Sequence, residues 1–164
     1  MSGIGGVVVE KIVSGGQTGA DRAALDVAVE LGIATGGWIP HGRRAEDGTV
    51  PRRYQGIVEA DSESYENRTE LNVRDSDATV VFSFGPPTGG SALTVRLAHS
   101  LGKPLLALDL ERSTTDEAIA RLRTWLAEAH PRVLNVAGPR LSQEPRIAEA
   151  TAMILRGAIR PAVG

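Results

Sequence analysis

The segment ATVVFSFGPPTGGS, residues 78–91, decides the fold class of this sequence. Its first half, from Ala78 to Phe84, is apolar and rich in β-branched and aromatic residues, which is typical of a buried strand. The glycine- and proline-rich half that follows predicts a turn into a helix, which ends near Leu101 with Gly102 as its C-cap. A buried strand that leads at once into a helix is the repeating unit of a parallel α/β sheet.

The same unit recurs on both sides of this segment. We expect further strands over residues 7–13, 34–39, 105–108 and 133–136, and helices over 20–31, 68–74, 114–130 and 147–159. Residues 40–64 lack periodicity and are predicted to form a long functional loop. The alternation predicts a single α/β domain over residues 1–164, with a doubly wound, mainly parallel, Rossmann-like sheet of about five strands and helices on both faces.

Composition excludes several classes of function. A formal net charge of -2 over 164 residues leaves no basic field to hold nucleic acid. The absence of cysteine excludes disulfides, thiolate chemistry and sulfur-ligated metal centres. No apolar run approaches the roughly 18 residues of a membrane span, and the N-terminus lacks the pattern of a signal peptide. We therefore expect a cytoplasmic protein that binds neither nucleic acid nor membranes.

Two glycine loops of matching construction, SGGQTG (14–19) and GPPTGGS (85–91), each lead from a predicted strand into a helix. The first N–H groups of a helix are unpaired and carry partial positive charge, and glycines let a ligand approach them. Ligands of doubly wound sheets bind where the winding direction reverses, so we expect both loops to face one anion-binding crevice. The simpler alternative is a pair of tight turns. The candidate ligand-binding residues here are Gly15, Gly16, Gln17, Thr18, Gly19, Thr88, Gly89, Gly90 and Ser91.

Neither loop matches a standard nucleotide-binding motif. Ser14 stands where the first glycine of a dinucleotide fingerprint belongs, and residues 38–41 contain no carboxylate to bind a ribose. The second loop has no lysine after Gly90, where a P-loop requires one. An ordinary NAD enzyme and a standard NTPase are both disfavoured.

Further candidates lie beside the loops. Asp21, in the first helical turn, either interacts with the helix dipole, orients Arg22 or hydrogen-bonds to a ligand amine or hydroxyl. His41, on the expected crevice side, is either a structural hydrogen-bonding residue or a ligand contact. Three scattered histidines and no paired ligand cluster predict no protein-made metal site. A basic loop is either solvated surface or a cover that attracts an anion; it contains Arg43, Arg44, Arg52 and Arg53.

A series of motifs in order over residues 12–150 resembles the molybdenum carrier family. They are SGGQTGAD (14–21), PHGRRAEDG (40–48), RTELNV (68–73), DSDAT (75–79), TGGS (88–91) and NVAGPR (135–140). That family belongs to the lysine-decarboxylase-like (SLOG) Rossmann group, with its elements circularly permuted. The resemblance implies a dimer or tetramer that binds and protects molybdenum cofactor, a phosphorylated pterin, without transforming it. It also implies enzymes that deliver or accept the cofactor. It places Arg68, Thr69 and Asn72, on one short helix, and Gly138 and Arg140, after the last strand, around the ligand.

Two alternatives remain open. Related phosphoribohydrolases resemble the chain around its second loop, but Thr94 stands where they carry a glutamate, which disfavours their hydrolytic mechanism. The second alternative is a sensor domain that binds a nucleotide monophosphate or derivative and signals through oligomer contacts. We expect a binding protein with no catalytic residues.

Overall fold

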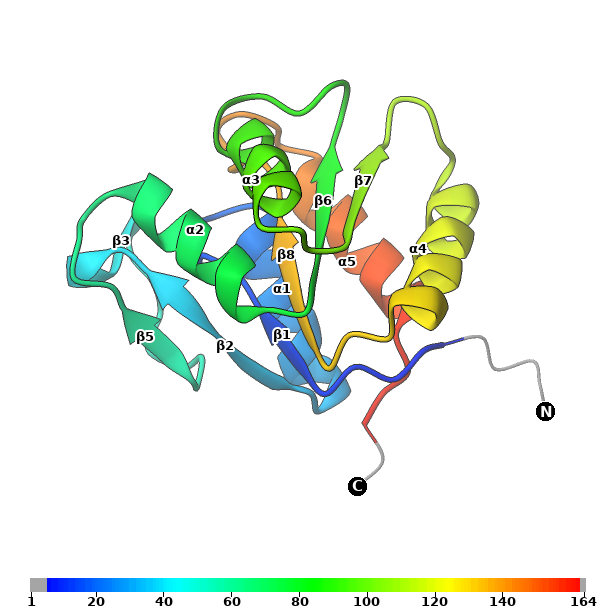
Figure 1. Ribbon diagram of the computed structural model, residues 1–164, viewed down its shortest axis with the longest axis horizontal. Coiled ribbons are helices and arrows are strands. Elements are labelled where there is room, and N and C mark those ends of the chain that lie inside the picture. The colour runs from blue at the N-terminus through cyan, green and yellow to red at the C-terminus, as the bar shows by residue number, and fades with distance from the viewer. Residues whose placement is uncertain (1–5, 163–164) are drawn as a thin grey trace.

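The structure is a computed structural model that describes residues 6–162. Within that range, six strands form one parallel sheet in the order β5–β2–β1–β8–β6–β7 (Figure 1). The strands are β1 (Lys11–Val13), β2 (Ala34–Ile39), β5 (Ile57–Glu59), β6 (Ala78–Ser83), β7 (Leu105–Asp109) and β8 (Val133–Ala137).

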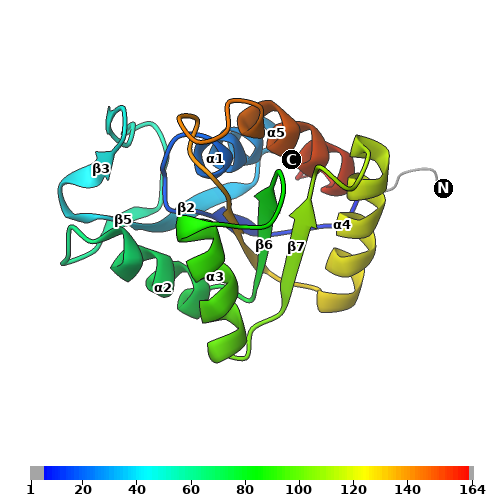
Figure 2. The same cartoon turned by 90° about the horizontal axis from the view of Figure 1, so that it is seen from above.

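Helices cover both faces of this sheet. One face carries α1 (Ala20–Leu31), α4 (Thr115–Ala129) and α5 (Ile147–Ala158), and the other carries α2 (Tyr65–Asp75) and α3 (Gly89–Ser100), as Figure 2 shows. The α/β class and the doubly wound arrangement are confirmed, with six strands in the described range rather than about five. The connection from β1 runs outward to β2, whereas the connection from β6 runs in the opposite direction to β7.

The first strand is shorter than the apolar run at residues 7–13 predicts, because β1 begins only at Lys11. Val7 instead forms an isolated parallel bridge with Ile159, and the neighbouring Val8 is 62% exposed. The backbone of Val7 accepts a hydrogen bond from Arg160 and donates one to Ala158. The chain that leaves α5 therefore occupies the hydrogen-bonding groups that would have extended the sheet.

Residues 40–64, predicted as one long loop, contain several ordered elements. A short 3₁₀ turn (His41–Arg43) leads into the antiparallel hairpin of β3 (Arg44–Ala45) and β4 (Gly48–Thr49). The edge strand β5 then pairs with β2. Elements of two or three residues are too short to show periodicity, and they are stabilised by tertiary contacts.

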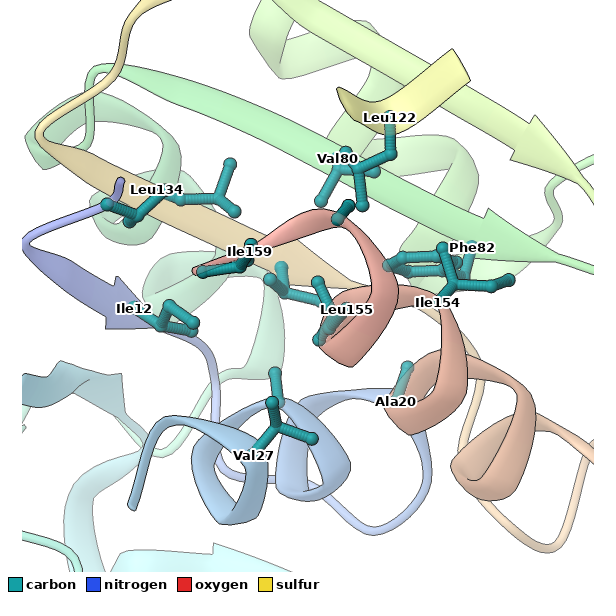
Figure 3. Packing of buried hydrophobic residues seen from close by; sticks show 14 of the residues in the cluster. Ile12, Ala20, Val27, Val80, Phe82, Leu122, Leu134, Ile154, Leu155 and Ile159 are labelled. Carbon is teal, nitrogen blue, oxygen red and sulfur yellow. The ribbon is translucent and has the colours of Figure 1, made fainter. Parts of the chain in front are cut away.

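The main core lies between the sheet and the helices α1, α4 and α5. Phe82 and Leu134 from the strands pack with Val27, Leu122 and Leu155 from the helices (Figure 3). All six residues of β6 are buried, as expected for a central strand covered on both faces. This packing fixes the carboxyl ends of β1, β8 and β6 side by side.

The N-terminus of α4 provides a test of local stability. The Thr114 hydroxyl accepts a hydrogen bond from the Glu117 N–H at 3.1 Å, and the Glu117 carboxylate accepts one from the Thr114 N–H at 2.9 Å. We expect Thr114→Ala to lower the free energy of unfolding by about 1 kcal/mol in urea denaturation, because this capping box is lost. The neighbouring exposed Thr115→Ala serves as the control, and an equal effect of both variants would contradict the assignment.

Candidate functional site

A cavity of about 290 Å³ lies at the carboxyl edge of the sheet, where the winding direction reverses. The loop after β1, the start of α2, the first turns of α3 and the loop after β8 form its walls. This is the position at which open α/β sheets bind ligands, and the volume is at the lower end of the range for small-molecule sites.

The structure brings part of the predicted set of residues together around this cavity. The predicted residues that line it are Gln17, Asp21, Arg68, Gly89, Gly90, Ser91, Gly138 and Arg140. Those that do not line it are Gly15, Gly16, Thr18, Gly19, His41, Asn72 and Thr88. Thr69, which the family resemblance placed beside Arg68, lines the cavity too, and the lining also includes Tyr65, Glu66 and Gln143, which were not predicted as ligand contacts.

The glycines of the first loop serve contacts between protein groups. A Cβ atom on Gly15 would overlap the guanidinium of Arg68, and one on Gly19 would overlap the carbonyl oxygen of Pro139. Gly19 also has a φ of 85°, which favours glycine. These glycines therefore let α2 and the loop after β8 pack closely against the first loop. The protein requires glycine here for this packing, and not to let a ligand approach as the sequence predicted.

The hairpin of β3 and β4 holds this loop in place. Glu46 accepts hydrogen bonds from the hydroxyls of Thr18 and Ser142, and these bonds lower the pKa of its carboxyl group. The Glu46 N–H donates to Oε1 of Gln17 at 2.8 Å, and the Thr18 N–H donates to the same oxygen at 3.1 Å. The sequence predicted that the Thr18 hydroxyl binds the ligand. In the structure this hydroxyl donates to Glu46 instead, and Thr18 does not line the cavity.

Asp21 and Arg68 form a largely buried ion pair in the cavity wall. Oδ2 of Asp21 lies 3.4 Å from Nη1 of Arg68 and accepts a hydrogen bond from the Gln17 N–H at 3.3 Å. Burial raises the pKa of Asp21, although the positive charge of Arg68 acts in the opposite direction. Arg22 does not pair with Asp21, because its guanidinium binds Asp47 at 2.6 Å.

The N-terminus of α3 opens directly into the cavity. The N–H groups of Ser91 and Ala92 bond to the carbonyl of Thr88, whereas no acceptor within residues 6–162 pairs with those of Gly89 and Gly90. A Cβ atom on Gly90 would meet nothing within 4 Å. Free N–H groups at the positive end of a helix dipole, on residues that line a cavity, suit an oxyanion.

A small cavity of about 90 Å³ adjoins the main one, and Ser91 and Gln143 line both. Thr88 belongs to this smaller space, so the second glycine loop lies between the two.

Three arginines surround the ring of Tyr65 at the cavity rim. The guanidinium carbons of Arg44, Arg68 and Arg140 lie 5.2, 5.7 and 5.3 Å from the ring centroid. Arg140 forms no ion pair with any residue of the described chain. Arg68 is paired with Asp21 and Arg44 with Glu63 at 3.8 Å, so Arg140 is the arginine of the three that remains available to attract an anion.

Two other arginines of the basic loop, Arg43 and Arg53, bind protein groups outside the cavity. Arg43 is buried, and its guanidinium donates to the carbonyl groups of Val50 and Pro51. Arg53 pairs with Asp26 at 3.2 Å. Of the loop's arginines, Arg44 is the one that stacks on Tyr65 at the rim.

Two of the predicted ligand-binding residues, Asn72 and His41, lie outside the cavity. Asn72 bonds to the backbone N–H and carbonyl of Trp38 at 2.8 and 2.9 Å, so it fixes α2 against β2. His41 is exposed in the 3₁₀ turn, away from the cavity. Among residues 6–162, no cluster of three His, Asp or Glu side chains could hold a metal ion.

Thr94 is buried in α3, and its hydroxyl donates to the carbonyl of Gly90 at 2.9 Å. The carboxylates that line the cavity are therefore those of Asp21 and Glu66.

A second space of about 390 Å³ lies between α1 and α5. Both of its arginines are already paired, Arg22 with Asp47 in the same lining and Arg156 with the neighbouring Glu30. Glu149, which also lines this space, forms no ion pair with any residue of 6–162, so the unpaired charge there is negative and does not suit an anionic ligand. No helix within the described range is both long and apolar enough to cross a membrane.

The comparisons with known proteins agree with this architecture. Residues 12–159 match the model of the "Circularly permutated YpsA SLOG family". The crystal structure of "Putative molybdenum carrier protein" from Syntrophus aciditrophicus SB is similar with a TM-score of 0.89, at 47% sequence identity over 92% of this chain and 94% of that one. The search of curated proteins found no match. The matched region spans nearly the whole sheet and all the walls of the cavity, so this chain belongs to the circularly permuted YpsA SLOG family.

Proposed function

We propose that this protein binds molybdenum cofactor in the cavity at the carboxyl edge of the sheet and carries or protects it without chemical turnover. The observation that carries the proposal is that Gly89 and Gly90, whose N–H groups have no acceptor within residues 6–162, line the same cavity as Arg140, which forms no ion pair there. The cofactor's terminal phosphate suits these donors. The name of the similar Syntrophus protein supports the choice of cofactor.

The rest of the cavity suits a flat heterocycle. In this proposal the pterin lies against Tyr65, whose ring is flanked by Arg68 and Arg140, and Arg44 limits access of solvent from the rim. Binding then depends on enclosure of the whole ligand. Following the family resemblance, we also propose that the protein acts as an oligomer in the cytoplasm and passes the cofactor to an acceptor enzyme.

The absence of turnover is proposed from Thr94 and from the fixed position of Asp21; Glu66, the other cavity carboxylate, lies in the first turn of α2 and not at the position of the hydrolases' glutamate in α3. Thr94 cannot supply a negative charge to a ribose carbon, and its hydroxyl is already hydrogen-bonded within α3. Asp21 is held by Arg68 and the Gln17 N–H, so moving it toward a reacting atom would break both contacts.

The test is to incubate the purified protein with molybdenum cofactor, separate it from free cofactor by gel filtration, and repeat the separation with excess AMP. We expect the cofactor to elute with the protein and AMP to leave it bound. Failure of the cofactor to bind, or ready displacement by AMP, would favour the nucleotide alternatives instead.

A further inference from the structure

The two carboxylate oxygens of Asp21 have different surroundings. Oδ2 accepts hydrogen bonds from the Gln17 N–H and from Arg68, at 3.3 and 3.4 Å. No group of residues 6–162 donates a hydrogen bond to Oδ1. This oxygen is also not one of the fully buried atoms that lack a partner, so it is accessible from the cavity. The side chain is 5% exposed and lines the cavity. Oδ1 is therefore a free acceptor in the wall of the proposed ligand site.

The protein cannot easily satisfy this oxygen itself. Arg22, one residue further along α1, is held by Asp47 and by the carbonyl of Gly16. The side-chain oxygen of Gln17 is fixed by two backbone donors. Asp21 is also anchored through its backbone, because its carbonyl accepts a hydrogen bond from the Ser14 hydroxyl at 2.9 Å. The nearby donors Gln17 Nε2 and Arg68 Nε are buried without partners, yet neither bonds to Oδ1 in this arrangement. Oδ1 is therefore left for a group that enters the cavity.

We propose that Asp21 is a specificity-determining residue whose Oδ1 accepts a nitrogen-bound hydrogen from the ring edge of the ligand. This rests on the proposed function, because it takes the phosphate to be bound at the N-terminus of α3. An ionised carboxylate oxygen accepts only, and it has two lone pairs. It therefore favours a 2-amino-4-oxo ring, in which a ring N–H stands beside an amino group. Pterin and guanine share that edge.

An adenine edge fits this oxygen less well. Its amino group stands beside a bare ring nitrogen, whose lone pair would face the carboxylate and repel it. The cavity would thus distinguish two phosphorylated purines whose phosphates bind equally. This selectivity also predicts that AMP competes poorly with molybdenum cofactor.

Ligand series on the wild-type protein test this directly. Isothermal titration with GMP, 1-methyl-GMP, AMP and ribose 5-phosphate compares ligands with one phosphate and different edges. We expect GMP to bind at least about tenfold more tightly than each of the others, the effect of one hydrogen bond to a charged acceptor. Inorganic phosphate should compete with all four.

Variants identify the residue responsible. Asp21→Asn should remove most of the preference for GMP over AMP. Asp26→Asn is the matched control, because Asp26 is an arginine-paired carboxylate on the same helix outside the cavity, and it should keep the preference. If Asp21→Asn does not fold, the wild-type ligand series still decides.

The outcomes separate this inference from the proposed function. Equal binding of AMP and GMP, with competition by inorganic phosphate, would overturn the role of Asp21 and leave the phosphate site intact. Absence of binding by the phosphate compounds and by molybdenum cofactor would overturn both.

Discussion

Gly90→Leu is expected to abolish binding of molybdenum cofactor while the fold remains intact. Gly90 lines the cavity and a Cβ atom added there meets nothing within 4 Å, so we expect a leucine side chain to be accommodated at the helix N-terminus without disturbing the fold. It would displace the phosphate from the N–H groups of Gly89 and Gly90. We expect at least about a 100-fold loss of affinity, because several charge-assisted hydrogen bonds are lost together. Gel filtration with cofactor and thermal unfolding measure the two effects.

Two control variants accompany Gly90→Leu. Gly90→Ala adds one carbon at the same place and should weaken binding less. His99→Leu adds an apolar side chain at an exposed position near the other end of α3 and should leave binding unchanged. If Gly90→Leu retained wild-type affinity, the phosphate would not lie at this helix terminus.

Gly19→Ala is expected to lower the free energy of unfolding by about 3 kcal/mol, because it combines a strained φ with overlap against backbone. The φ of Gly19 is 85°, and the added Cβ would overlap the carbonyl oxygen of Pro139. Neither the start of α1 nor the loop after β8 can move without disturbing the cavity. Urea denaturation followed by circular dichroism measures the loss.

Gly42→Ala is the reference for an alanine at a positive φ without close packing. Gly42 has a similar φ of 81° but no atom within 4 Å of the added carbon. Its cost should be only the conformational part, about 1 kcal/mol. Because ψ is -129° at Gly19 and 5° at Gly42, the larger loss expected for Gly19→Ala combines a less accessible backbone conformation with the overlap against Pro139. Equal destabilisation by the two variants would show that neither adds to the cost.

The fold could be predicted from the sequence where one element carries its own pattern. The buried strand β6 and the helices α1 and α4 have regular apolar spacing and clear end residues, and the structure places them as expected. The prediction was wrong where a distant segment of the same chain determines the secondary structure. Val7 has the composition of a strand, but the segment after α5 takes its hydrogen bonds.

The candidate site was predictable only in part for the same reason. Both glycine loops look alike in sequence, yet the first is packed against Arg68 and Pro139, while the second opens into the cavity. Spacing along the chain cannot distinguish these environments. The bonds of Glu46 to Thr18 and Ser142 join three distant segments, so no local pattern reveals them.

Tyr65 shows what a local pattern would have supplied. It lies three residues before Arg68, at the start of α2, so both side chains fall on one helix face. Placing Arg44 and Arg140 around the same ring, however, required the tertiary structure.

The most direct test of the central claim is a crystal structure of the protein with molybdenum cofactor bound. We predict that the phosphate oxygens accept hydrogen bonds from the N–H groups of Gly89 and Gly90, with the pterin beside Tyr65 and Asp21. Cofactor bound in the space between α1 and α5, with the N-terminus of α3 unoccupied, would contradict the account.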